Sequence, residues 1–458
     1  MNEALDNRIQ QFDLVDALAE FAANVTFADL SSEAVEAAQI FIMDTLAVGI
    51  AGVTYDATDK ALAAAKLWGE GSNRVLGRPG VRLPRPSAAF VNGTQLHALE
   101  WDGLHDLSVV IALCAPVGAM AAEFERQRIS GEALIVAVVV AIEVAVFFGG
   151  DTSASPRFFR PSAAGGMGAA AGMAKLRGFD KQQLIHTLGL AHAQTAGTMQ
   201  AHWEGSMALP MQIGNASRMA HLSVDMVEAG MTGPIDFIDG QFGYFKLFES
   251  GEQIDRLLAE LGRPFKVLQM AHKPYPAGRA TQAALTMIRE LRANEPIVAS
   301  DIASIDIHVP PLIMLLVGRP ATPDMTPSYA RLCLKFILPL MFLDDDIDPR
   351  RFDKATFSDS EITRIGQLVH IHDDGNEDRN ALGPQRMQIR LKNGRSMGAY
   401  CDTPLGAPDN ALSKRQREDK VRRCFELGLV ADHAEQFIDA SNQLAKLNDV
   451  SSLLDLVS

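Results

Sequence analysis

Apolar residues recur at helical spacing through most of the first 260 residues. The pattern predicts two helices between residues 11 and 53, and further helices over residues 87–99, 115–127, 131–148, 165–175, 189–200 and 213–228. Residues 37–50 and 133–148 are apolar almost all round, so we expect both stretches to form buried helices. The second stretch is shorter than the roughly 20 residues that span a bilayer, and we therefore expect no membrane span.

Strand patterns begin only after about residue 265. Residues 302–309 alternate apolar and polar side chains, which predicts a half-buried strand. Two further alternating runs, 387–391 and 396–400, flank the dipeptide Asn393-Gly394. Asn-Gly between alternating runs favours a tight hairpin turn. Residues 370–374 carry two histidines and two aspartates and are predicted to form an exposed acidic loop.

The order of these elements predicts two domains. Helical stretches accompany the strands, and the pattern of the tail returns to helix. We predict an all-helical domain formed by residues 1–265 plus 403–458, and a smaller α+β domain over residues 266–402. The expected fold class is therefore mostly α with an inserted α+β lid domain.

Composition narrows the function. The 458 residues carry a formal net charge of −14, which argues against nucleic acid or an anionic membrane as the main partner. The four cysteines form no metal-binding spacing and are expected to be free thiols in a reducing compartment. The N-terminal segment is acidic and lacks the pattern of a secretory signal, so we expect a cytoplasmic protein.

The main polar cluster is His97, Glu100, Asp102 and His105. If the helix predicted before it runs on, His97 and Glu100 share one face. Two imidazoles and two carboxylates within nine residues suit proton transfer near neutral pH. The alternative is a solvated helix end with a capping Asp102. A metal site is the weaker interpretation, because the spacing fits no common metal-binding template.

A second cluster contains Lys273, Tyr275 and Arg279, within a Pro- and Gly-containing segment just before a predicted helix. Cations beside the free N–H groups of a helix N-terminus form a carboxylate or phosphate site. The alternative is a rigid inter-domain linker with surface charges.

A third candidate anion site has Arg160 and Ser162 at a predicted helix N-terminus, with a surface turn as the alternative. His202 is a weaker candidate for the same cleft, because nothing in the sequence around it distinguishes a lining residue from an ordinary one.

Several segments, in this order, resemble the MmgE/PrpD family: residues 43–49, 92–98, 168–180, 189–200, 273–276 and 327–345, with the hairpin near 393–394. The resemblance covers nearly the whole chain. It implies a helical domain with an α+β lid inserted before the last helices, assembled as a homodimer. It also implies elimination, decarboxylation or epimerisation next to a carboxylate, without a redox cofactor and generally without a metal.

The family's acidic motif is similar to residues 100–105 here, with Gly103 and Leu104 at two positions that are polar in the family. The resemblance implies proton transfer by Glu100, Asp102 and His105, with Lys273 retained. The remaining candidates would bind the substrate: His97, Arg160, Ser162, His202, Tyr275 and Arg279.

The leading hypothesis is a lyase that acts on a small carboxylic acid by proton abstraction, with neither cofactor nor metal. The alternatives are a cofactor-free epimerase or isomerase of a similar acid, and a non-catalytic relative that binds a ligand.

Overall fold

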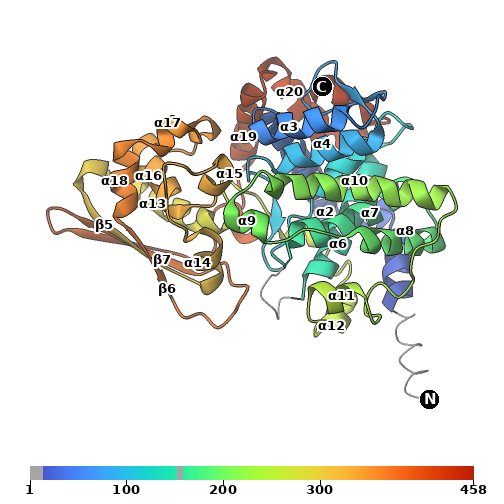
Figure 1. Cartoon of the computed structure of the whole chain (residues 1–458), viewed down its shortest axis with the longest axis horizontal. Coiled ribbons are helices and arrows are strands. Elements are labelled where there is room, and N and C mark those ends of the chain that lie inside the picture. Colours follow the sequence, from blue (N-terminus) through green and yellow to red (C-terminus); the bar gives the residue numbers. More distant parts are fainter. Residues whose placement is uncertain (1–13, 152–157, 458) are drawn as a thin grey trace.

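The computed structural model describes residues 14–151 and 158–457. A large helical body and a smaller α+β part lie side by side (Figure 1). The helices of the body are 14–24, α2 Ser32–Gly52, α3 Asp56–Lys66, α4 Arg85–His97, α5 Cys114–Ala121, α6 Gly131–Gly149, α7 Arg160–Leu176, α8 Lys181–Gln194, α9 Gln200–Glu204, α10 Ala208–Glu228, α11 Tyr244–Phe248 and α12 Ile254–Ala259.

Helix α7 lies at the centre of the body, in contact with α5, α6, α8 and α10. Its run of Ala and Gly residues allows these neighbours to approach closely. A Cβ added at Gly168 would lie 2.3 Å from the carbonyl oxygen of Ala141 on α6, which only glycine permits. The central helix predicted from the small residues at 165–175 is therefore confirmed.

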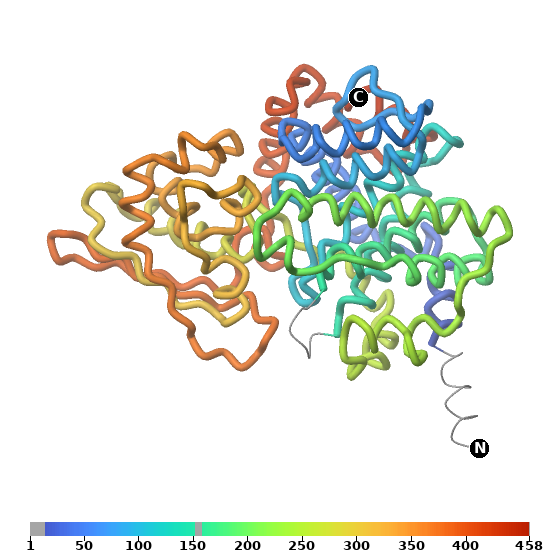
Figure 2. The backbone as a smooth tube through the Cα atoms, in the orientation of Figure 1, coloured from blue at the N-terminus to red at the C-terminus, as the bar shows by residue number. Residues whose placement is uncertain are grey.

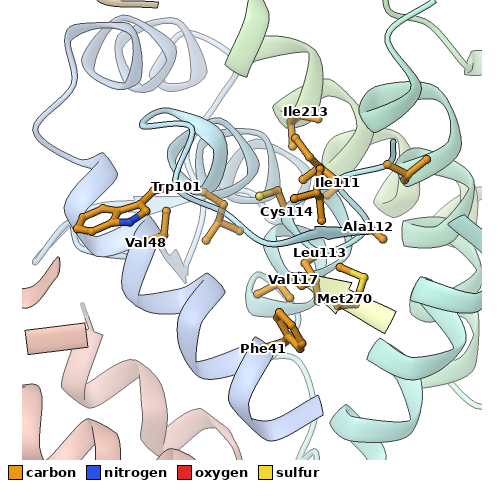
Figure 3. Close-up of a cluster of buried hydrophobic side chains, with 14 of the residues drawn as sticks. Phe41, Val48, Trp101, Ile111, Ala112, Leu113, Cys114, Val117, Ile213 and Met270 are labelled. Carbon is orange, nitrogen blue, oxygen red and sulfur yellow. The ribbon is translucent and has the colours of Figure 1, made fainter. Parts of the chain in front are cut away.

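Helices α2 and α6 are long and apolar enough to cross a membrane by length and composition. In this fold 72% of the apolar window of α2 and 89% of that of α6 are buried inside the protein. Both are core helices, as the all-round apolar pattern predicted. Phe41 and Val48 of α2 extend toward a cluster of buried side chains that includes Ile111 and Cys114 (Figure 3).

The α+β part contains a mixed four-stranded sheet in the order β6-β5-β7-β8. Its strands are β5 Ile302–Val309, β6 Val369–Asp373, β7 Gln385–Leu391 and β8 Ser396–Cys401. Strand β5 pairs parallel with β6 and antiparallel with β7, which forms a hairpin with β8. Side chains of β7 alternate strictly between buried and exposed, so the sheet has one core face. The predicted strand at 302–309 and the Asn-Gly hairpin are confirmed.

Helices cover one face of this sheet (Figure 1). They are α13 Gln282–Asn294, α14 Pro311–Val317, α15 Pro327–Ala330, α16 Leu334–Asp344, α17 Lys354–Phe357 and α18 Ser360–Gln367. The prediction of a loop at residues 370–374 was wrong over 370–373, because His370 and His372 lie on the edge strand β6. An exposed edge strand needs few apolar side chains, and its backbone pairing with β5 leaves no local sequence signal.

The C-terminal tail returns to the helical body. It forms α19 Lys414–Leu427, α20 Ala434–Asn442 and α21 Ser451–Val457. Helices α19 and α20 pack against α2. The backbone trace therefore brings the two ends of the described chain into one body, with the red tail beside the blue helices (Figure 2).

Two pairs of very short strands lie outside the main sheet. Strand β1 (Asn73–Arg74) pairs with β2 (Arg82–Leu83), and β3 (Leu104–His105) pairs antiparallel with β4 (Met270–Ala271). The second pair matters for function, because it aligns Leu104 with Ala271 and so brings residues 100–105 beside Lys273. Two-residue strands are too short to produce an alternating pattern, which explains why the sequence did not predict them.

Candidate active site

Helix α4 ends at His97, so the helix does not run on to Glu100 and the two residues do not share one of its faces. Glu100 has a φ of 53°, in the left-handed region that non-glycine residues rarely adopt. Such a conformation costs on the order of 1 kcal/mol and persists only where the surroundings impose it. The turn folds the chain back on itself. The His97 ring then lies between two carboxylates, with Nδ1 3.1 Å from Asp102 Oδ1 and Nε2 3.2 Å from Glu100 Oε1.

Lys273, which follows strand β4, completes this group of charged side chains. Its Nζ donates a hydrogen bond to Glu100 Oε2 at 3.1 Å and lies 3.6 Å from Asp102 Oδ1. We call His97, Glu100, Asp102 and Lys273 the acid–base cluster. All four side chains are buried, and Glu100 is the most accessible of them at 9% side-chain exposure.

The four side chains of the acid–base cluster are each charged, and their charges sum to zero. Burial disfavours the imidazolium, but the carboxylates of Glu100 and Asp102 outweigh burial and raise the pKa of His97 to about 10. Burial also opposes ionisation of both carboxyls, yet His97 and Lys273 lower the pKa of Glu100 and of Asp102. The same carboxylates raise the pKa of Lys273 against the effect of burial. At neutral pH two carboxylates therefore face one imidazolium and one ammonium.

The loop that carries the two carboxylates is held from the C-terminal tail. Lys420 of α19 donates to the carbonyl of Trp101 at 2.8 Å, between Glu100 and Asp102 in the sequence. The same ammonium lies 2.7 Å from Asp44 Oδ1 on α2, and both side chains are buried. This second ion pair fixes the Glu100 turn against two helices of the body.

A cavity of about 80 Å³, partly open to solvent, lies in front of Glu100 and Lys273. Most of its wall is apolar, with side chains from the helical body and from the α+β part. The apolar lining residues are Leu104, Val109, Ile111, Phe158, Phe159, Pro161, Met199, Gly278, Ala280, Leu312, Leu316, Val317, Leu332 and Leu382. The ionisable lining residues are Glu100, Arg160, His202, Lys273 and Arg279.

His202 lines this cavity, in agreement with the weaker sequence interpretation. Burial and then the nearby Arg319 lower the pKa of His202 to about 4, so the ring is neutral at pH 7. Arg319 Nη2 lies 3.3 Å from His202 Nδ1. A guanidinium has only donors, so Nδ1 accepts and the ring proton resides on Nε2. His202 is therefore a hydrogen-bond donor.

Arg160 and Arg279, predicted to hold substrate carboxylates, are paired within the protein. Arg160 donates to both oxygens of Glu249, at 2.7 and 2.8 Å, and to Asn380. Arg279 donates to both oxygens of Asp106, at 2.8 and 2.6 Å. Bidentate pairs of this kind use the guanidinium geometry fully. Both arginines line the cavity, so substrate binding by them stays a prediction. Their partner carboxylates lie 89 and 173 positions away and leave no local signal.

Two other predicted binding residues do not present a free polar group to the cavity. The Ser162 hydroxyl donates to the carbonyl oxygens of Ala196 and Gln212. Tyr275 is buried and is absent from the cavity wall, where the neighbouring Lys273 is present.

The structure does not bring His105 into the acid–base cluster. Its Nδ1 is 2.8 Å from Ser108 Oγ and its Nε2 is 3.1 Å from Gln269 Oε1. Burial lowers the pKa of His105, so its ring is neutral at pH 7. His105 lines a second, more polar cavity beyond Asp106 and Lys266. Leu104 lines the first cavity, whereas the next residue, His105, lines the second. Adjacent residues of a strand point to opposite sides, which explains why β3 presents these two side chains to different cavities.

Sequence reasoning missed Asp44, Lys420 and Arg319. The signal for Asp44 was available, since a lone carboxylate in an otherwise apolar helix must be paired when buried. Its partner Lys420 lies 376 positions later, within an ordinary charged helix face, and the sequence offered no way to connect them. Arg319 lies in a loop with no distinguishing motif.

His97, Asp102 and Cys114 place possible metal-ligand atoms within 4.8 Å of one another. Their protonation states disfavour that role. Burial, and then Asp102, raise the pKa of the Cys114 thiol, and a metal site needs the thiolate. His97 is protonated, and the Lys273 ammonium already lies beside Asp102. The cluster therefore suits proton chemistry better than metal binding.

Comparison with known proteins now decides the family. The MmgE/PrpD N-terminal domain matches residues 16–257, and the MmgE/PrpD C-terminal domain matches residues 275–446. The chain belongs to the MmgE/PrpD family. The family prediction made from the sequence is confirmed, as is the mostly α two-domain fold.

Similar proteins of this family are cis-aconitate decarboxylases. The one from Homo sapiens is 26% identical over 93% of this chain and 91% of its own length. The one from Mus musculus is 27% identical, over 91% of this chain and 87% of its own length. The one from Aspergillus terreus is 23% identical, over 96% and 95% of the two chains. Decarboxylases are lyases, which is the class of enzyme that the sequence predicted.

Proposed function

We propose that this MmgE/PrpD protein is a lyase that acts on a small carboxylic acid by removing a proton next to a carboxylate. The observation that carries the proposal is the contact of Glu100 with Lys273, 3.1 Å apart at the wall of the cavity. This contact places a proton acceptor and a cation where one substrate can touch both.

Lys273 is the group that receives the substrate carboxylate. Its ammonium lines the cavity, and it is bound by side chains rather than locked in a bidentate pair. An ammonium beside a substrate carboxylate also stabilises the negative charge that develops when the neighbouring C–H bond is broken.

Glu100 is the base. Among the described residues lining the cavity, it is the only ionised proton acceptor, because the others are cations or the donor His202. In the free protein His97 and Lys273 lower the pKa of Glu100, which makes it a weak base. A substrate carboxylate that draws Lys273 away removes one of those cations. The basicity of Glu100 then rises when the substrate is bound.

Two other polar residues complete the site: Asp102 positions the charged side chains, and His202 donates a hydrogen bond. Asp102 is fully buried and does not line the cavity, so it is a positioning residue that holds His97 and Lys273. His202 Nε2–H is available to a substrate carbonyl or carboxylate oxygen. When water is lost, the electron pair of the broken C–H bond forms a double bond as the hydroxyl group departs with a proton. When carbon dioxide is lost, the electron pair of the broken C–C bond stays on the substrate and takes up a proton, so either reaction transfers protons and needs no redox cofactor.

Deuterium exchange tests this proposal. The protein is incubated with a panel of mono-, di- and tricarboxylic acids in deuterated buffer, and the acids are analysed by NMR and mass spectrometry. We expect at least one acid either to exchange the proton next to its carboxylate and lose water, or to lose carbon dioxide and take up deuterium at the carbon that carried it. Exchange without loss of either group would instead assign an epimerase. No exchange and no product with any acid would refute the proposed chemistry.

A further inference from the structure

We propose that the open face of the α+β sheet binds Zn²⁺ through three histidines, His308 of β5 together with His370 and His372 of β6. We call these residues, with Asp306, the sheet cluster. The site lies apart from the proposed active site, because other residues of the described chain line both cavities.

The register of two neighbouring strands brings the sheet cluster together. Strands β5 and β6 run parallel, with Asp306 opposite His370 and His308 opposite His372. Residues two apart on a strand point to the same side, so all four side chains project from one face of the sheet. Helices cover the other face (Figure 1), and the three histidines are exposed. Two short segments that carry no motif separately thus form one array of possible metal ligands.

His308 and His372 already lie against each other. Their ring centroids are 4.8 Å apart, and the ring planes differ by 24°. Two imidazoles that bind one zinc ion each place a nitrogen about 2.0–2.1 Å from it. Exposed side chains change rotamer freely, so a small rotation of both rings directs their nitrogens to one ion. His370, two residues before His372 on the same side of β6, supplies a third imidazole.

Asp306 holds one of these rings in the form that a metal requires. His372 Nε2 lies 3.0 Å from Asp306 Oδ1, and Ser304 Oγ donates to the other carboxylate oxygen at 3.2 Å. A neutral imidazole that donates through Nε2 has its lone pair on Nδ1. Histidines that bind metals usually donate their other ring N–H to a carboxylate or carbonyl, which fixes the tautomer and the ring orientation. The Asp306–His372 contact therefore presents Nδ1 as a metal ligand.

The charges around the cluster permit a cation. Arg386 lies opposite His308 on β7, but its guanidinium is 5.7 Å from the centre of the Tyr400 ring on β8. Strand β8 is on the far side of β7 from β5, so this contact draws the positive charge away from the histidines. Imidazole ligands suit Zn²⁺, whereas Mg²⁺ prefers oxygen ligands. The ligand set thus points to a transition metal.

Calorimetric titration of the metal-free protein with ZnCl₂ tests the proposal directly. We expect a saturable Zn²⁺ site that His308→Ala and His372→Ala each abolish. Asp306→Asn should weaken it about tenfold, because a neutral amide orients His372 less firmly. The control is His433→Ala, an exposed histidine of the C-terminal tail, which should bind Zn²⁺ like the wild type. Thermal unfolding of the metal-free variants shows whether each retains its fold.

A large excess of MgCl₂ should leave the Zn²⁺ affinity unchanged, and displacement of Zn²⁺ by Mg²⁺ would contradict ligation by imidazoles. Three further results would overturn the proposal: a wild-type protein without a saturable Zn²⁺ site, wild-type affinity in either the His308 or the His372 variant, or an equal loss in His433→Ala. Metal affinity is measured here without turnover, so failure of this site and failure of the proposed reaction are separate results.

Discussion

Glu100 combines three unusual properties in one residue. It adopts a left-handed backbone conformation, it is buried, and it contacts both an imidazolium and an ammonium. The attraction between these charges compensates for the strained turn and for the loss of hydration. A residue held in this way is preorganised, so little rearrangement is needed when a substrate arrives.

Replacement of Glu100 by Gln tests its role as the base. Glu100→Gln keeps the size of the side chain but removes the proton acceptor, so we expect kcat/KM to fall by about 10²- to 10⁴-fold. The control is Glu204→Gln, an exposed position on α9, which should leave activity unchanged. Steady-state kinetics with an acid found in the exchange panel gives the comparison. Retention of more than about a tenth of the activity would exclude Glu100 as the base.

The raised pKa of His97 predicts how stability depends on pH. The folded protein holds this proton more tightly than the unfolded chain, since the pKa rises from 6.5 to about 10. Its contribution to the free energy of unfolding is complete below pH 6.5 and is lost as the pH rises through about 10. We expect wild-type stability to fall between pH 7 and 10 more steeply than that of His97→Gln. Denaturant unfolding at several pH values measures this, and parallel curves would contradict the assignment.

At the scale of elements, local patterns predicted what local forces determine. The strand at 302–309, the Asn-Gly hairpin and the buried helices α6 and α7 followed from periodicity, turn chemistry and small residues. The end of α4 at His97 did not follow from a local pattern, because charged side chains from distant parts of the chain hold the turn at Glu100. The pairing of β3 with β4 was equally hidden, since two residues of strand carry no pattern.

In the site, too, local patterns were predictable from the sequence and contacts between distant residues were not. The sequence singled out His97, Glu100 and Asp102 because acid–base residue types cluster there, and it placed Lys273 in a separate candidate anion site. It did not predict the ion pairs of Arg160 and Arg279, because their partner carboxylates become neighbours only in the folded chain.

Helix α19 is predicted to support the site through Lys420. Lys420→Met leaves the Asp44 carboxylate buried without a cation, so we expect a loss of about 3–5 kcal/mol in the free energy of unfolding. Adding Asp44→Asn should recover part of this loss, because it removes the unpaired charge. Lys414→Met on the same helix is the control, with a side chain 75% exposed and an expected loss below about 0.5 kcal/mol. Equal losses for Lys420→Met and Lys414→Met in chemical denaturation would refute the buried pair.

At the scale of the whole molecule, the cavity exists because two parts of the chain face each other. The helical body supplies the acid–base cluster, and the α+β part supplies much of the apolar cover, including Leu312 and Leu316. Asp106 of the body and Arg279 of the α+β part form an ion pair across this junction. The segment that carries Lys273 connects the helical body to the α+β part. This segment therefore both brings the Lys273 ammonium into the site and fixes the position of the α+β part relative to Glu100.

A structure of the protein with a bound acid from the exchange panel gives the sharpest test of the proposed active site. We expect a carboxylate within hydrogen-bonding distance of Lys273 Nζ, with the adjacent carbon facing Glu100. A carboxylate bound instead in the second cavity, beside His105 and Lys266, would contradict it.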